Sequence, residues 1–148
     1  MSRYLFRALS IVFLLSAPAF AQEPQISKQS QVTLVLWTAN DCVYCTRWKG
    51  SMGGKGDLMR WPGFAQIEYL EIERPSLRGS FSPEHFASSQ GWLRDDSLAS
   101  RRASSAVPAW SIYVDQVHVV TAVGLRNWER IIFPKLRDLA QNKVRPES

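Results

Sequence analysis

The chain has only two cysteines and two histidines in 148 residues, and it shows no internal repeat, low-complexity tract or heptad pattern. Two cysteines cannot build a framework of several disulfides, and His85 and His118 do not complete the ligand spacing of a zinc finger. Lysine and arginine outnumber acidic residues 18 to 13, but they are scattered, and Arg101-Arg102 is the one adjacent pair. Since nucleic-acid binding requires a concentrated basic face, it is not predicted.

The first 21 residues have the pattern of a secretory signal peptide. Arg3 and Arg7 supply a positive start, residues 8–16 form an apolar run, and Ala19-Phe20-Ala21 is an A-x-A cleavage site. The run is short for a membrane span of about 20 residues, so we expect cleavage and export, to the periplasm or its equivalent, rather than an anchor. Residues 22–31 predict a flexible lead-in, residues 32–143 one folded domain, and residues 144–148 a tail.

Both cysteines lie in Cys42-Val43-Tyr44-Cys45, directly after an apolar run that predicts a buried strand over 32–37. A short helix is expected from Cys42 to about Lys49, capped by Asn40 or Asp41. Two thiols on the first turn of a helix can form a disulfide, and the helix N-terminus favours a thiolate at Cys42. A disulfide that closes so short a loop adds little stability through chain entropy. The motif therefore indicates redox chemistry rather than a cross-link.

The rest of the chain alternates helical and strand patterns, which predicts an α/β domain. The glycine-rich stretch 50–57 lacks the order of a Walker motif and predicts a flexible surface loop. The other expected elements are a strand over 66–73, a helix from Ser82-Pro83-Glu84 through Trp92, a further helical piece over 96–102, a hairpin of strands 110–114 and 117–122, and a helix over 125–142 that Pro134 kinks or restarts.

The predicted elements run in the order strand, CxxC helix, strand, helical segment, Val107-Pro108, hairpin and C-terminal helix. This order resembles the thioredoxin superfamily over almost all of the domain. The resemblance implies a thioredoxin-like α/β fold, with a central mixed sheet of about four strands flanked by helices. It implies that Cys42 is the attacking nucleophile and Cys45 the thiol that resolves the mixed disulfide. The Cys42–Cys45 pair would be the redox centre, with no metal and no organic cofactor.

The resemblance also implies a substrate site beside these cysteines. Pro108 matches the cis-proline of the family, and the backbone of Val107 would pair with an extended substrate segment. Val43 and Tyr44, between the cysteines, are the other expected substrate contacts. The implied partners are protein thiols and disulfides and a membrane protein that donates electrons, and the domain is expected to be a monomer.

Two positions depart from the family pattern. Leu36 stands where thioredoxins carry a buried aspartate, so proton transfer to and from Cys45 needs another group, and neither Glu68 nor Glu71 can be assigned that role from sequence. Asp41 precedes Cys42, where its carboxylate raises the pKa of a thiol while the helix N-terminus lowers it. The sequence does not show whether these two effects together raise or lower the pKa of Cys42.

The sequence thus favours an exported thiol–disulfide oxidoreductase, more plausibly a reductase than an oxidant. Two alternatives remain open at this point. One is a module that binds copper(I) through the two thiolates. The other is a non-catalytic interaction domain, which exposed tryptophans would support, Trp48 and Trp61 above all. The six tryptophans are Trp37, Trp48, Trp61, Trp92, Trp110 and Trp128.

Overall fold

The computed structural model describes residues 26–100, 102–103 and 106–144. The expected signal peptide lies outside these residues, as do the start of the lead-in and all but the first residue of the tail. No helix in the described part of the chain is long and apolar enough to cross a membrane.

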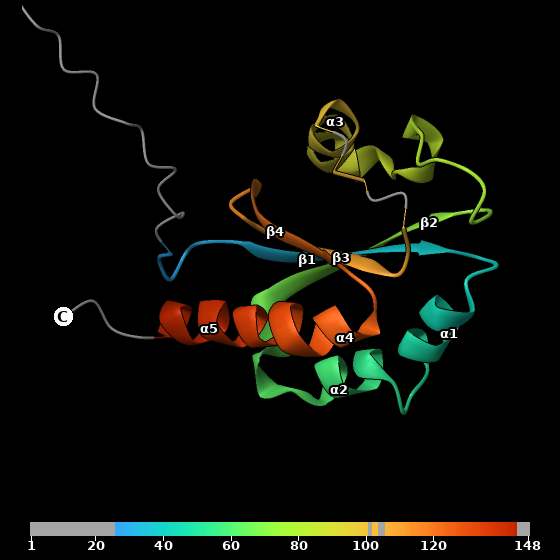
Figure 1. Cartoon of the computed structure of the whole chain (residues 1–148). Coiled ribbons are helices and arrows are strands. Elements are labelled where there is room, and N and C mark those ends of the chain that lie inside the picture. The colour runs from blue at the N-terminus through green and yellow to red at the C-terminus, as the bar shows by residue number, and fades with distance from the viewer. Residues whose placement is uncertain (1–25, 101, 104–105, 145–148) are drawn as a thin grey trace, which may run out of the picture.

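A four-stranded mixed sheet forms the centre of the fold, in the order β2-β1-β3-β4 (Figure 1). β1 pairs in parallel with β2 and antiparallel with β3, which pairs antiparallel with β4. The prediction of four strands and of an α/β class is confirmed. The bounds are β1 Val32–Ala39, β2 Ile67–Arg74, β3 Ala109–Val114 and β4 Val117–Val123.

Helices cover both faces of the sheet (Figure 1). One face carries α1 (Val43–Lys49), α2 (Gly54–Arg60), α4 (Leu125–Asn127) and α5 (Phe133–Val144), and the other carries α3 (Gly91–Ala99). All eight residues of β1 are buried, because its side chains meet helices on both sides. This central position explains why the run from Val32 is apolar almost without interruption.

Three indoles form the centre of the core beneath α1 and α4. The ring centroids of Trp48, Trp110 and Trp128 lie 5.0–5.4 Å apart in all three pairs. Trp48 is 2% exposed, so it is not one of the exposed tryptophans that an interaction surface would need. Its place in the core also removes the main support for an interaction surface built on tryptophan. Trp61 is half-buried and packs edge-on against Phe133.

The glycine-rich stretch is not a loop throughout, because α2 begins at Gly54. A Cβ at Gly54 would lie 2.1 Å from Nε1 of Trp48 and 2.7 Å from Nε1 of Trp128. Glycine is therefore needed here so that the chain can pass close to the indoles. Of the loop expected over 50–57, residues 50–53 lie outside any helix and residues 54–57 belong to α2.

The helix expected from Ser82 is also shorter than its pattern suggests. Pro83–His85 is a single 3₁₀ turn, and α3 begins only at Gly91. Phe81 and Phe86 both pack edge-on against Trp37, with centroids 5.2 and 6.2 Å away. Contact of both rings with the sheet holds the chain extended at Phe86, which ends the turn.

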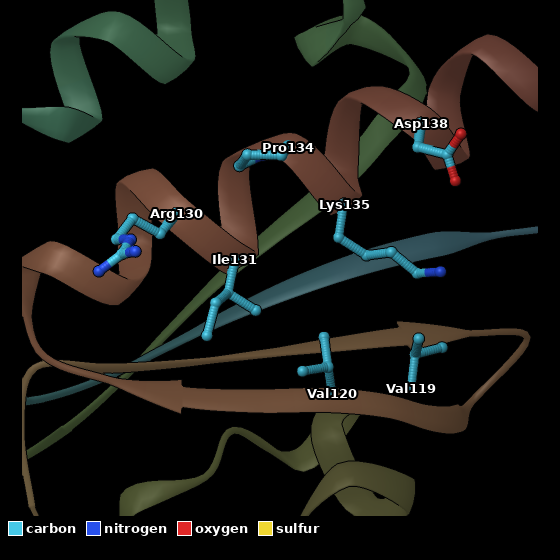
Figure 2. Close-up of a pocket in the computed structure, with 7 residues that line it drawn as sticks. All are labelled: Val119, Val120, Arg130, Ile131, Pro134, Lys135 and Asp138. Atoms are coloured by element: carbon cyan, nitrogen blue, oxygen red, sulfur yellow. The ribbon is translucent and has the colours of Figure 1, made fainter.

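The C-terminal helix changes its winding before Pro134, as the sequence predicted. Trp128–Ile132 forms a π-helical turn between α4 and α5, and Pro134 is the second residue of α5, where a missing N–H is tolerated. This helix packs over the edge strand β4. A hollow of about 550 Å³ lies between them. Figure 2 shows Ile131 and Lys135 extending from the helix toward Val120 and Val119.

His118 on β4 gives the fold a testable pH dependence. Its Nε2 lies 2.8 Å from Oγ1 of Thr121, and burial, together with Arg102, holds the pKa of His118 below its ordinary value of 6.5. Below pH 6.5 the unfolded chain therefore binds more protons at this site than the folded chain, and stability falls as the pH falls.

We expect the free energy of unfolding to decrease between pH 6.5 and 5 more steeply in the wild type than in His118→Gln, which keeps a hydrogen-bonding side chain. Urea denaturation at several pH values measures this. If the free energy of unfolding fell equally with pH in the two proteins, His118 would not contribute to the pH dependence of stability.

Candidate functional site

The two cysteines form a disulfide at the junction of β1 and α1. Their Cα atoms lie 5.2 Å apart, and Cys42 is the residue at the N-terminal cap of α1. Its Sγ accepts a hydrogen bond of 3.1 Å from the backbone N–H of Cys45. An N–H directed at sulfur stabilises a thiolate at that position. The exposed fraction is 2% for Cys42 and 0% for Cys45, so what little access there is leads to Cys42.

The segment before β3 lies against this disulfide. The Val107–Pro108 peptide bond is cis. Val107 packs on the small cluster of Ala39, Cys42 and Cys45, and the carbonyl of Pro108 accepts a hydrogen bond of 2.8 Å from the N–H of Gly124. The structure thus brings the two motifs noted in the sequence, CxxC and Val-Pro, into contact across 62 residues of chain.

A hollow of about 280 Å³ opens beside the disulfide, and we call it the Tyr44 pocket. Its lining consists of Tyr44, Val107, Pro108, Gly124 and Leu125. The sequence singled out the first three of these residues as substrate contacts, but it predicted no role in the site for Gly124 or Leu125. Only the register of β3 with β4, which pairs Ala109 with Val123, shows that these two residues reach the site.

The residues between the cysteines are exposed and apolar. Val43 is 76% exposed and Tyr44 62% exposed, far above the values expected for side chains that belong to a core. Together with the Tyr44 pocket, they give the disulfide an apolar surround. Such a surface suits an extended polypeptide better than a small polar ligand.

Asp41 does not cap α1, contrary to the sequence-based expectation. Its carboxylate accepts hydrogen bonds from Oγ of Ser76 (2.8 Å) and from the N–H of Leu77 (2.7 Å), across the loop that follows β2. These bonds, the one from Ser76 first, lower the pKa of the Asp41 carboxyl. Asn40 does not cap the helix either, since the cap is Cys42 itself. A fixed negative charge therefore stands on the residue that precedes Cys42.

Removal of this charge is expected to make Cys42 more acidic. Asp41→Asn keeps an oxygen for the Leu77 N–H but loses the carboxylate that opposes a thiolate, so the thiolate fraction of reduced Cys42 should rise about twofold to threefold at a pH below the pKa of the thiol. The pH dependence of alkylation by iodoacetamide measures this.

Asp95→Asn is the matched control, because Asp95 is an exposed acid on α3. Equal alkylation rates in the wild type and Asp41→Asn would contradict the prediction.

Neither Glu71 nor Glu68 takes the place of the buried aspartate of thioredoxins. Leu36 is fully buried, and its partner across the sheet on β2 is Glu71. The Glu71 carboxylate pairs with Lys55 and accepts a hydrogen bond of 2.7 Å from Tyr69. Burial opposes ionisation of Glu71, but these hydrogen bonds outweigh it and hold its pKa below the ordinary value. Glu71 therefore stays ionised and engaged. Glu68 accepts from Thr33, near the opposite end of β1.

Within the described residues, no group of three or more histidine, cysteine or acidic side chains is placed to hold a metal ion. The two sulfurs of the copper hypothesis are joined to each other as a disulfide. His118 is engaged with Thr121, and Nδ1 of His85 accepts a hydrogen bond from the N–H of Ser82.

The strand order, the disulfide at the start of α1 and the Val-Pro segment facing it define a thioredoxin-like fold with a CxxC site. No protein-family model matches the chain, and no curated protein matches it. Several solved structures have a similar backbone. A thioredoxin of Malassezia sympodialis has a TM-score of 0.47 and 11% identity, over 74% of this chain and 78% of its own.

Two further structures are bacterial. The periplasmic thioredoxin SoxS from Paracoccus pantotrophus, in its reduced form, has a TM-score of 0.47 and 13% identity, over 76% of this chain and 98% of its own. A thioredoxin-fold protein from Helicobacter pylori has a TM-score of 0.42 and 11% identity, over 84% of this chain and 91% of its own. At such identities the function has to be argued from the residues of this chain.

Proposed function

We propose that the chain is a thiol–disulfide oxidoreductase that exchanges its Cys42–Cys45 dithiol with disulfides of other proteins. The observation that carries the proposal is the disulfide itself, which joins two residues three positions apart at the start of α1 and lies beside an apolar pocket. A disulfide of this kind stabilises little and is well placed to react. Within the described residues no hydrogen bond engages the backbone of Val107, so its N–H and C=O are available to an extended partner.

In the reducing direction, the Cys42 thiolate attacks one sulfur of the partner disulfide. The partner's S–S bond breaks, its other sulfur leaves as a thiolate that takes a proton from water, and a mixed disulfide links Cys42 to the partner. Cys45 then loses its proton and attacks Sγ of Cys42, which re-forms the Cys42–Cys45 disulfide and releases the second thiolate of the partner. Two electrons pass from the dithiol to the partner, and oxidation of a dithiol reverses the same steps.

We infer that the protein works after export and acts as a reductase. The support for export is the signal-peptide pattern of residues 1–21. A reductase in an oxidising compartment needs a membrane protein that returns electrons to the disulfide, and a monomeric domain suffices for this exchange. The mass of the mature protein tests the cleavage site, because removal of residues 1–21 leaves Gln22 at the N-terminus.

The direction is tested by the reduction potential of the Cys42–Cys45 pair, measured by equilibration with glutathione buffers and trapping of thiols with a maleimide. A potential near about −270 mV, that of thioredoxin, is expected for a reductase. A potential near about −120 mV would identify an oxidant instead. A pair that does not exchange with glutathione at all would overturn the proposed function.

A further inference from the structure

A second hollow, of about 600 Å³, adjoins the Tyr44 pocket, and Leu125 lines both. It lies where α1 and the start of α2 meet α4, and we call it the Arg47–Arg126 groove. Met52 lies at its edge and is 97% exposed. A fully exposed methionine at the edge of a groove is a flexible apolar contact for a bound chain. Leu125 therefore connects the groove with the Tyr44 pocket beside the disulfide.

Two arginines and two acids line this groove, and they differ in their partners. Arg47 on α1 and Arg126 on α4 are both exposed, and neither forms an ion pair with another described residue. Of the two acids in the lining, Asp57 is paired with Arg60 at 2.7 Å. Glu129 is then the one lining acid without an ion pair in the described part of the chain, beside two arginines that also have none. The groove thus offers two guanidinium groups to an incoming anion.

An indole N–H without an acceptor in the described part of the chain lies beneath the floor of the groove. The Nε1 atom of Trp48 is buried and has no hydrogen-bond partner among the described residues. It lies directly beneath Gly54, and Nε1 of Trp128 approaches the same glycine. A buried N–H without an acceptor leaves uncompensated positive potential beneath the floor, which favours a negatively charged group above it.

We propose that the Arg47–Arg126 groove binds an acidic side chain of the partner polypeptide whose sulfur exchanges with Cys42. The inference rests on the proposed function and adds a substrate class to it, namely cysteines with a glutamate or aspartate nearby in an extended segment. The carboxylate lies between the two guanidinium groups, which is a charge-assisted interaction, and the aliphatic part of the side chain contacts Met52. The partner chain passes over Leu125 as it runs from the Tyr44 pocket into the groove.

The test uses the reduced mature protein and peptides whose single cysteine is joined by a disulfide to 2-nitro-5-thiobenzoate. Attack by Cys42 on the peptide sulfur releases the coloured thiobenzoate thiolate, so its appearance gives the second-order rate. One series places glutamate at two to five residues on either side of the cysteine, and a matched series places glutamine there. We expect the best glutamate peptide to react about fivefold faster than its glutamine counterpart at low salt.

The double variant Arg47→Glu/Arg126→Glu should abolish or reverse this preference. Arg137→Glu is the control, because Arg137 is exposed on α5 and lies outside the groove, yet its substitution changes the charge in the same sense. Equal rates for every glutamate and glutamine pair, or a preference that the double variant retains, would overturn the inference while exchange with glutathione still supported the proposed function. Failure of the wild type to exchange with glutathione or with any peptide would overturn both.

Discussion

Cys42→Ser should lower the rate of protein-disulfide reduction by at least about 100-fold, to the rate seen without the protein. The thiolate is the attacking group, and a serine hydroxyl does not ionise at neutral pH. The one other cysteine of the chain, Cys45, is fully buried, so no exposed sulfur is left to take over the attack. Reduction of a disulfide-bonded protein substrate in the presence of dithiothreitol, followed by turbidity, measures the loss.

Cys45→Ser should give a different result, because Cys42 can still attack but nothing resolves the product. We expect a covalent complex between this variant and its partner, visible as a stable mixed disulfide by mass spectrometry without reductant. The double variant Cys42→Ser/Cys45→Ser is the control and should form none. Complexes trapped by Cys42→Ser instead of Cys45→Ser would mean that the roles of the two cysteines are reversed. That outcome would be surprising, because Cys45 is fully buried.

The elements that could be predicted from sequence are those whose signal is local. Each of the four strands was placed within two residues at either end, since β-branched and alternating apolar residues report directly on a half-buried or buried strand. The Asp115-Gln116 turn was also visible, and both residues adopt positive φ, as a two-residue hairpin loop requires. The CxxC motif and Val107-Pro108 could be chosen because each has a recognisable spacing.

The features that sequence reasoning missed depend on contacts between distant segments. Asp41 resembles a helix cap locally, but its partners lie 35 and 36 residues away in the loop after β2. Trp48 follows Cys45 by one helical turn and so looks like part of the site, yet it points into the core, where Trp110 and Trp128 surround it. Nothing within a few residues of either side chain reveals these partners.

The two missed residues of the site, Gly124 and Leu125, show the same limit. They follow β4, the edge strand, and reach the disulfide only because β4 pairs with β3, whose first residue follows Pro108. The site is therefore assembled at one end of the sheet from the end of β1, the start of β3 and the end of β4. A sequence signal exists for the first two contributions, in CxxC and Val-Pro. The contribution from the end of β4 has no sequence motif, and its one distinctive feature is the positive φ of Gly124.

Gly54→Ala should destabilise the fold by about 3 kcal/mol, because the added Cβ would overlap the indoles at the centre of the core. The nearest atom would be Nε1 of Trp48 at 2.1 Å, with Nε1 of Trp128 at 2.7 Å, and both indoles are held by the other rings of the core.

Gly91→Ala is the matched control, since its Cβ would meet nothing closer than 3.9 Å and it lies in the first turn of α3 with helical φ and ψ. Alanine there should be neutral or add up to about 1 kcal/mol, because it restricts the unfolded chain. Urea denaturation of the two variants under oxidising conditions measures the difference. A Gly54→Ala protein as stable as the wild type would show that α2 can move away from the indoles, and that glycine at this position serves the groove rather than the core.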